Sequence, residues 1–593
     1  MERRVLLAVV LSFLVLYGYQ RFLVPPPPAT EDASATTAAP APDAPEGAPA
    51  VGAQGQPAAL APGASPATGT GDAAPGTAVA EALIGETVAR DITVETSTVV
   101  AVLSNRGGRV VSWKLKGFAD ASGQPLDLVP EGLAEDAARP FTLVVDDAAL
   151  TTRLNAALYG VTGAAGNRLD ATSTAGTLVF EFQDTSGLQV RKTFQFEPSG
   201  YVVRFSATVA TAAGPVVPAL AWGPGLGDAG ARTGGSFFTG NYVQPAEAIY
   251  HVDGDVERVS VGDLQTQPVY EGQYRYVGVD DHYFIAALLN PGQVRAEFRP
   301  LTIPSPDGTE RQQVASTFRL AGGLMDLGIY AGPKQFDALQ ATDQELVRVI
   351  NFGVFGFLAV PLLSALKWIH GGVGNWGWSI ILLTVLINIA IFPLRHRSVV
   401  SMRKMQLLQP KMKAIQDRYA GLKMTDPKRQ NMQTEVMNLY RENGVNPASG
   451  CVPMLLTLPV LFAFYSLLSQ AIELRGAPFG LWITDLSQRD PYYVTPVLMG
   501  LTMFWQQRIT PSTADPTQQK VMMMMPLIFS FMFLSAPSGL VVYWFVSNLW
   551  AIGQQYFTSW MIGPPPVSNV RPPAERRLKN AGAGRTPGAT RGN

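Results

Sequence analysis

Apolar and polar positions follow different patterns along this chain, and the apolar run from Trp376 to Leu394 decides its class. The run holds 19 residues, with one strongly polar side chain, Asn388, near its middle. At about 1.5 Å per residue, a helix of this length spans the roughly 30 Å hydrocarbon core of a bilayer. Four further apolar runs follow, at 453–472, 492–507, 521–536 and 540–556. The pattern predicts a multi-domain membrane protein whose α-helical core, residues 373–562, contains five spans.

The chain begins with another apolar segment, residues 1–24, which opens on the charged residues Glu2, Arg3 and Arg4. A cleaved secretory signal is the alternative, but the apolar part is long and no small-x-small cleavage site follows it closely. We therefore expect an uncleaved transmembrane anchor with its N-terminus in the cytoplasm. Residues 25–82 are almost entirely Ala, Pro, Gly, Thr and Ser. Such a composition cannot bury enough apolar surface to offset the entropy of ordering, so it predicts a disordered tether.

Between residues 83 and 340 the apolar period changes to two. Val203, Phe205 and Ala207, for example, alternate with polar positions, as in a strand that buries one face. The pattern predicts a large all-β domain of the antiparallel sandwich type. Because Cys451 is the only cysteine, no intramolecular disulfide can form and the domain must be held together by its core.

One stretch of this domain, Asp280 to Tyr283, has residue types that occur in glycan or metal sites. An Asp-Asp-His run at a turn is more often a solvated loop. We therefore expect these side chains to be exposed to solvent, and no catalytic constellation stands out elsewhere in the domain.

Charge places the segments on the two sides of the membrane. Residues 395–447 carry eleven Lys and Arg against four acids, and the tail, 563–593, carries six against one. Because positive loops stay in the cytoplasm, both are expected there and the β domain on the other side. This topology leaves no crossing for the apolar segment 341–372, which has Glu345 and Lys367 near its ends. We expect this segment to be an amphipathic helix in the membrane interface.

The basic loop 395–447 has a helical period of its own. Asp426 and Pro427 suit the start of a second helix, so the loop is predicted to form a cytoplasmic helical hairpin. The hairpin either links two spans as a self-packing pair or docks a chain arriving from the cytoplasm. The apolar stripe of its first helix is spaced by threes and fours and consists of Met402, Met405, Leu408, Met412, Ile415 and Tyr419.

Four strings in the second half of the chain occur together: Asn446 to Pro453, Glu473 to Ser487, Asp490 to Tyr493 and Pro537 to Leu549. With them, the region from Trp376 to Tyr556 resembles the YidC/Oxa/Alb family of membrane protein insertases. The resemblance is weaker over the β region, where Asn105 to Gly108 and Arg191 to Phe194 are the best matches, and is absent from the tether. The anchor and the large extracytoplasmic domain resemble the Gram-negative form of the family.

The resemblance implies a periplasmic β domain with a supersandwich fold, and a membrane core around a hydrophilic groove that is open to the cytoplasm and to lipid. The family's groove positions fall on Thr384, Asn388 and Trp544, with Tyr543 beside the last of them and Arg395 at the groove rim. Counted from the N-terminal anchor, the third and fifth spans are 453–472 and 521–536. The surface along which a substrate's apolar segment would slide into lipid falls on these two spans, at Thr457, Tyr465, Met525, Phe529 and Met532.

Three positions depart from the family pattern. The groove position that is commonly a cation is Asn388, the position that is often Tyr is Trp544, and a frequent Gln is Thr457. Without a fixed charge at position 388, we expect the groove to act by hydration and hydrogen bonding. From the residues alone, Thr384 and Asn388 form a polar strip on one helix face, which is costly in lipid unless it is hydrogen-bonded or faces water. Hydrogen bonding between helices is the alternative role of Asn388.

By resemblance, the chain is expected to be an insertase and folding chaperone of the inner membrane, with both termini cytoplasmic. Expected partners are nascent membrane proteins, the Sec translocon, membrane lipids and the ribosome, whose RNA the basic tail suits, but not DNA. Neither enzymatic activity nor a cofactor is expected, and no phosphate-binding glycine motif occurs.

Two other classes of function stay open. A small-solute transporter or channel is the first, although the internal repeats or paired intramembrane charges expected of one are missing from the sequence. A membrane-anchored glycan-processing enzyme is the second, and it would need paired carboxylates in a cleft of the β domain.

Overall fold

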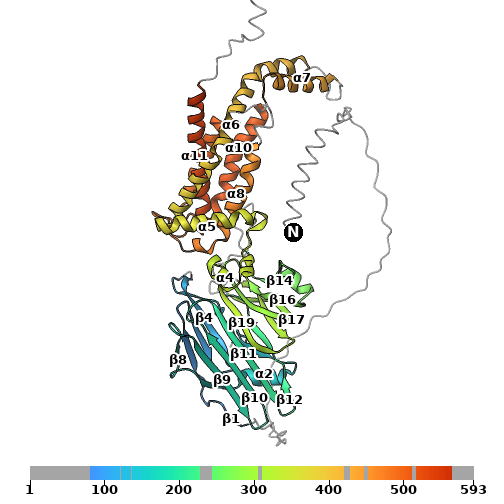
Figure 1. Cartoon of the computed structure of the whole chain (residues 1–593), viewed down its shortest axis with the longest axis vertical. Coiled ribbons are helices and arrows are strands. Elements are labelled where there is room, and N and C mark those ends of the chain that lie inside the picture. Colours follow the sequence, from blue (N-terminus) through green and yellow to red (C-terminus); the bar gives the residue numbers. More distant parts are fainter. Residues whose placement is uncertain are drawn as a thin grey trace, which may run out of the picture.

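The computed structural model describes residues 81–120, 122–134, 137–227, 244–304, 310–419, 428–445, 452–510 and 516–563. The predicted anchor, nearly all of the predicted tether and the basic tail beyond Gly563 lie outside these residues. The described chain has a β-rich part and a helical part, stacked along its longest axis (Figure 1). The β-rich part confirms the β domain that the period-two segments predict.

The β domain contains two sheets of unequal size. The smaller has five strands in the order β5 (Pro125–Asp127), β4 (Arg109–Ala119), β3 (Val99–Ser104), β2 (Asp91–Glu95) and β8 (Arg168–Asp170). The larger has 14 strands, and its main path is β1 (Ala82–Ile84), β9 (Gly176–Asp184), β10 (Gln189–Phe196), β11 (Val202–Thr211), β19 (Leu324–Pro333), β17 (Phe284–Pro304), β16 (Val269–Asp280), β14 (Glu247–Val252) and β15 (Asp255–Val259). Off this path lie β6 (Thr142–Val144), β7 (Gly160–Thr162), β12 (Gly214–Val216), β13 (Ala219–Gly223) and β18 (Glu310–Leu320).

The two best-matching strings of the β region meet in the core of this domain. Lys192, on β10, is completely buried, and its Nζ donates to the carbonyls of Gly107, Gly108 and Phe141 at 2.6, 3.1 and 2.9 Å. Gly107 and Gly108 form the turn between β3 and β4, and both have positive φ, 74° and 53°. Glycine adopts such angles readily, so the turn can aim its carbonyls at the ammonium group. The contact ties the smaller sheet to the larger one.

Short helices connect the strands and lead toward the membrane part. They are α2 (Ala148–Ala156), α3 (Val261–Thr266) and α4 (Phe336–Thr342) in the β domain, then the 3-10 turns η2 (Gln344–Val349) and η3 (Gly353–Phe355). The segment predicted as one interfacial helix over 341–372 is therefore divided, because only its second half forms an α-helix, α5 (Gly356–Val373).

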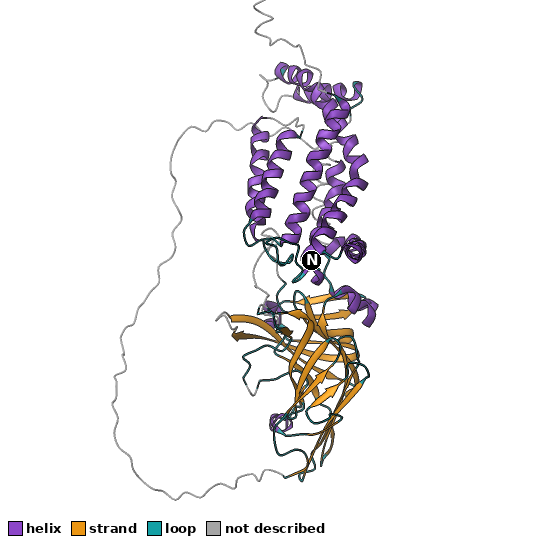
Figure 2. Cartoon of the chain, turned by 90° about the vertical axis from the view of Figure 1, so that its left-hand side faces the viewer, coloured by secondary structure: helices purple, strands orange, loops and turns teal. Residues whose placement is uncertain are grey.

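The helical part is a bundle whose main helices run along the long axis of the molecule (Figure 2). In contrast, α5 lies across the end of the bundle that faces the β domain (Figure 1). Among the described residues, two helical stretches are long and apolar enough to span a membrane, Gly353–Val373 and Trp376–Tyr419. The helices after α5 are α6 (Trp376–Arg418), α7 (Lys428–Glu442), α8 (Val452–Gln470), α9 (Val494–Ile509), α10 (Pro516–Met532) and α11 (Ser538–Ile562), with the 3-10 turns η5 (Ile472–Leu474) and η6 (Phe533–Ser535).

The helix that begins at Trp376 continues past Leu394, the predicted end of the span, because α6 runs without a break for 43 residues to Arg418. Pro393 lies inside it and removes one backbone hydrogen bond. The side-chain amide of Gln554, on α11, donates to the Phe392 carbonyl at 3.3 Å and supports the backbone beside the proline. The predicted hairpin thus consists of the far half of α6 and α7, while Asp426 and Pro427 lie outside the described residues. The two helices pack through Met405, Leu408, Tyr440 and Val445.

Candidate functional site

The polar strip predicted on α6 is buried in the bundle. Thr384 is completely buried and Asn388 is 4% exposed. The Thr384 hydroxyl donates to the carbonyl of Ile380 at 2.6 Å, and the Asn388 side-chain amide donates to the carbonyl of Thr384 at 2.8 Å. Both bonds stay within α6, so neither of them joins α6 to a neighbouring helix. The Asn388 amide oxygen is left to accept from another group.

That group is Arg395, whose guanidinium donates to Asn388 Oδ1 at 3.1 Å. The two residues are seven positions apart, which is close to two helical turns, so both lie on one face of α6. Side chains of a helix lean toward its N-terminus, and a long arginine can therefore extend back along the helix to reach the asparagine. The charge of Arg395 consequently lies deeper in the bundle than the Arg395 backbone does. The sequence predicts Arg395 at the groove rim.

The adjacent residues Tyr543 and Trp544 of α11 face different neighbours. Tyr543 is buried and stacks on Phe464 of α8, with ring centroids 4.3 Å apart. Trp544 is half-buried and packs edge-on against Phe533, with ring centroids 5.0 Å apart. Hydrogen bonds thus join Thr384, Asn388 and Arg395, whereas Tyr543 packs against α8 and Trp544 packs toward α10 and η6.

Several buried polar residues of α11 extend the strip, and the sequence reading missed them. His396 Nδ1 lies 3.2 Å from the hydroxyl of Thr558, which is completely buried. Gln554 is 6% exposed, and its Oε1 has no hydrogen-bond partner among the described residues. Gln555 is buried as well. Gln554 and Gln555 lie within the predicted span 540–556, but nothing in the sequence shows which face of the helix is buried, and Thr558 lies beyond the predicted end of that span.

The residues predicted for a sliding surface lie on two separate helices. Tyr465 of α8 and Phe529 and Met532 of α10 are half-buried, whereas Met525 is 43% exposed. Phe529 contacts Trp544, with ring centroids 5.9 Å apart. Thr457 belongs to α8, but its side chain lies outside the described positions.

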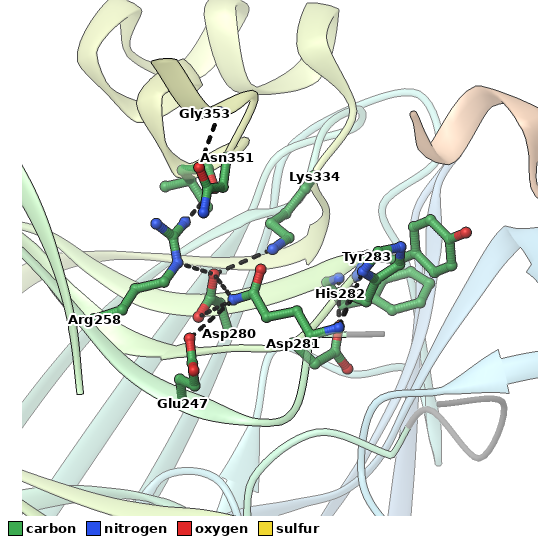
Figure 3. A network of polar contacts seen from close by, with 12 residues as sticks. Glu247, Arg258, Asp280, Asp281, His282, Tyr283, Lys334, Asn351 and Gly353 are labelled. Carbon is green, nitrogen blue, oxygen red and sulfur yellow. Dashed lines mark hydrogen bonds and ion pairs between the residues drawn. The ribbon is translucent and has the colours of Figure 1, made fainter. Parts of the chain in front are cut away.

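A second polar cluster lies where the β domain meets the helical part (Figure 3). Asp280 is completely buried and pairs with Lys334 Nζ at 3.1 Å and with Arg258 Nε at 3.4 Å. Gln244 donates to the same carboxylate at 3.3 Å. Burial raises the pKa of Glu247, and the nearby Asp280 carboxylate raises it further. Because Asp280 is enclosed by its own cations, this pair of acids fits a structural role better than a cleft for a substrate.

The prediction of a solvated loop at 280–283 is wrong, since Asp281 and His282 are 5% and 4% exposed. His282 Nδ1 accepts from the backbone N–H of Gln244 at 3.3 Å, so its proton lies on Nε2. Nε2 then donates to the carbonyl of Ser469, at 2.8 Å. Ser469 is in the last turn of α8, where helix carbonyls lack partners within the helix. Sequence reasoning missed this contact because its partners are 187 residues apart.

Other contacts join the two parts at the same place. Ile472, just after α8, is buried within the core of the β domain. The Arg475 guanidinium lies over the rings of Tyr283 and Phe284, 5.4 and 5.0 Å from their centroids. Lys367 of α5 pairs with Asp337 of α4 at 2.9 Å. The β domain is therefore packed onto the outer end of α8 as well as joined to it through the chain.

Known proteins resemble this chain over nearly its whole length. The family model described as "60Kd inner membrane protein" matches residues 368–563, and the model "YidC periplasmic domain" matches residues 91–365. A relative from Citrifermentans bemidjiense, named "Membrane protein insertase YidC", is 37% identical over 563 residues, covering 94% of this chain and 99% of the relative. A relative of the same name from Geobacter sulfurreducens is 37% identical over 576 residues, covering 94% and 98%. A solved structure of an active YidC insertase aligns over 81% of this chain and 95% of its own, with 18% identity and a TM-score of 0.33.

Proposed function

We propose, from the premise that this chain belongs to the YidC family of membrane protein insertases, that it inserts integral proteins into the inner membrane through the polar strip of α6 and α11. The family is one of the inner membrane with a periplasmic domain, so the helical part is the membrane core and the β domain is periplasmic. In the proposed mechanism the strip is a hydrophilic groove that receives the polar part of a substrate.

The observation that carries the proposal is the bonding of Asn388. This side chain is buried in the middle of a span, yet its hydrogen bonds run to Thr384 and Arg395 of its own helix. An asparagine that joined two helices would bond to the neighbouring helix, as Asn548 of α11 does with the Met499 carbonyl of α9, at 3.5 Å. The bonding of Asn388 therefore supports a surface kept polar for a substrate over a helix-to-helix contact.

Arg395 supplies the positive charge that position 388 lacks. Its guanidinium and the Asn388 amide form one polar pair in the strip. An acidic substrate segment can replace Asn388 as the acceptor of Arg395, because a carboxylate bonds an arginine more strongly than a neutral amide does. This exchange would lower the free-energy cost of bringing a charged tail out of water. The groove would thus combine hydration with one movable cation.

The apolar part of the substrate would leave along α8 and α10. Tyr465, Phe529 and Met532 offer half-buried apolar surface there, and α10 packs chiefly against α9. Exposed methionines, including Met525, add flexible side chains that can adapt to many different segments. We further propose that the chain acts alone on short substrates and beside the Sec translocon on larger ones, also as a folding chaperone. The basic tail, 563–593, would contact the ribosome.

The proposal is tested by substitutions at Asn388, with insertion of a short two-span substrate into vesicles as the measurement. Asn388→Leu should slow insertion at least about tenfold, because it removes the acceptor of Arg395 and dries the groove. Asn388→Arg should retain activity, since it restores a cation at that position. Full activity of Asn388→Leu would contradict a role for the strip in insertion.

Asn548→Leu is the matched control, because it also replaces a buried asparagine of a span. We expect it to lower the thermal stability of the bundle by removing a bond between α11 and α9, with little change in the insertion rate per folded protein. Asn388→Leu should show the opposite pattern, with slower insertion and an almost unchanged melting temperature. Equal loss of stability in the two variants would return Asn388 to the role of a helix-to-helix contact.

A further inference from the structure

A tight turn in the loop between α8 and α9 holds Leu481 in a strained backbone conformation. The Ile483 N–H donates to the Gly480 carbonyl at 3.1 Å and closes the turn. Leu481, the first of the two central residues, has φ 56°, whereas the second, Trp482, does not have a positive φ. A positive φ at a central position of a turn is usually taken by glycine, asparagine or aspartate. A leucine there is strained because its Cβ is disfavoured in left-handed conformations.

Packing within the described chain does not explain the leucine. The Leu481 side chain is 93% exposed. Trp482, next to it, is half-buried and donates its indole N–H to Asp490 Oδ1 at 3.0 Å. The turn would form more readily with glycine, and the core would lose nothing by the change. An exposed leucine at such a position points to a contact with something outside the chain.

The surface around the turn is apolar and continues onto membrane helices. Residues 476–483 contain no charged side chain. Phe479 packs edge-on against Trp378 in the first turn of α6, with ring centroids 5.8 Å apart. Exposed apolar side chains also occur at the end of α5, at the start of α6 and around the start of α9: Trp368, Val373, Trp378, Tyr492 and Val497.

The charged group that is bonded to the turn is a buried acid. Asp490 is completely buried and accepts from the backbone N–H groups of Tyr492 and Thr495, at 3.0 and 2.7 Å. Burial alone would raise the pKa of Asp490, but these hydrogen bonds hold it below its ordinary value. Arg475 lies over aromatic rings of the β domain. Residues 476–483 thus expose no charged side chain of their own, although charged residues lie on either side of them in the loop.

We propose that Leu481 inserts into the periplasmic leaflet of the bilayer and anchors the outer ends of α6 and α9 in the phospholipid interface. Lipid is the occupant because the apolar surface at the tip is continuous with membrane helices. Tryptophan and tyrosine, which surround the tip, are enriched at the depth of the lipid headgroups. Removing the leucine from water offsets the strain of its backbone. The inference rests on the membrane location of the helices and is independent of the groove.

The first experiment measures the depth of position 481 directly. Leu481→Cys, made in a Cys451→Ser chain, is labelled with an environment-sensitive fluorophore and reconstituted into phosphatidylglycerol and phosphatidylethanolamine vesicles that contain spin-labelled lipid. Met325→Cys on β19 is the matched control, because Met325 is also highly exposed but belongs to the β domain. We expect the shallow spin label to quench position 481 at least threefold more than position 325. Equal quenching at the two positions would overturn the proposal.

The second experiment separates the side chain from the turn. Asparagine tolerates positive φ, so Leu481→Asn should keep the turn and leave the melting temperature unchanged or raised. It should nevertheless move a fluorophore at Tyr492→Cys toward water, whereas Leu481→Phe should keep that fluorophore in lipid. An unchanged depth at position 492 in Leu481→Asn would show that the leucine does not anchor the loop, and would also overturn the proposal.

Discussion

The charge cluster around Asp280 and the polar strip around Asn388 both bury polar side chains, but they satisfy them differently. Asp280 is held by Lys334, Arg258 and Gln244, which come from separate segments of the β domain. Asn388 is held by Thr384 and Arg395 of its own helix, and Gln554 nearby has an oxygen without a partner among the described residues. Bonds between elements fix a fold, whereas bonds within one helix can exchange for a substrate without unfolding it. The cluster around Asp280 is therefore part of a structural scaffold, whereas the strip around Asn388 is the surface proposed to bind a substrate.

The strongest test of this difference removes the centre of the scaffold. Asp280→Ala leaves Lys334 buried without its counter-ion, which should lower the free energy of unfolding of the β domain by about 3–5 kcal/mol. Denaturant titration followed by tryptophan fluorescence measures this loss. Glu271→Ala is the control, because Glu271 forms an exposed ion pair with Arg295 at 2.8 Å. We expect the control to change stability by less than about 0.5 kcal/mol, and similar values for the two variants would break the comparison.

The corresponding change in the strip should affect insertion instead of stability. Arg395→Ala removes a hydrogen bond to a charged group, worth about 1.5–3 kcal/mol, so insertion of substrates with acidic tails should slow roughly tenfold or more. Substrates with neutral tails should insert almost normally, and Arg395→Lys should restore part of the rate. Arg397→Ala removes an exposed cation two residues away and is the control. If both alanine variants slow the same substrates equally, the strip has no special cation.

Helices and strands are predicted well where the pattern of apolar residues within the segment itself is enough to specify them. The span beginning at Trp376 and the strands around Phe205 follow from apolar period and length alone. The continuation of α6 through Pro393 was missed because hydropathy marks where the apolar run ends and not where the helix ends. The position of Asn388 was predicted, but the depth of the Arg395 charge depends on a side-chain direction that spacing does not specify. The burial of His282 likewise depends on Ser469, far away in the sequence.

Lys192 is buried in the β domain, and its titration should make the free energy of unfolding of that domain depend on pH. Burial lowers the pKa of Lys192 to about 7, and the neighbouring charge of Arg109 adds to this effect. Between that value and the ordinary lysine pKa of about 10.4, the unfolded chain holds more protons than the folded one, so stability rises with pH. From pH 7 to pH 8 the gain should be about 1 kcal/mol, relative to Lys192→Met measured in the same way. Parallel curves for the two proteins would contradict a titration of Lys192 in this range.

The contact between scaffold and membrane core should give the smallest effect, and a local one. His282→Phe removes the donor to the Ser469 carbonyl and leaves that carbonyl, in the last turn of α8, without the partner supplied by the β domain. A hydrogen bond of this kind contributes about 1 kcal/mol, so amide hydrogens at the end of α8 should exchange about fivefold faster in hydrogen–deuterium exchange. His251→Phe is the control, because His251 is also buried but its Nε2 faces Glu345, at 3.7 Å, and not a carbonyl of α8. Faster exchange in both variants would mean that the β domain stabilises α8 through general packing, whereas faster exchange in His282→Phe alone would show that one hydrogen bond couples the scaffold to the helix on which the proposed exit path lies.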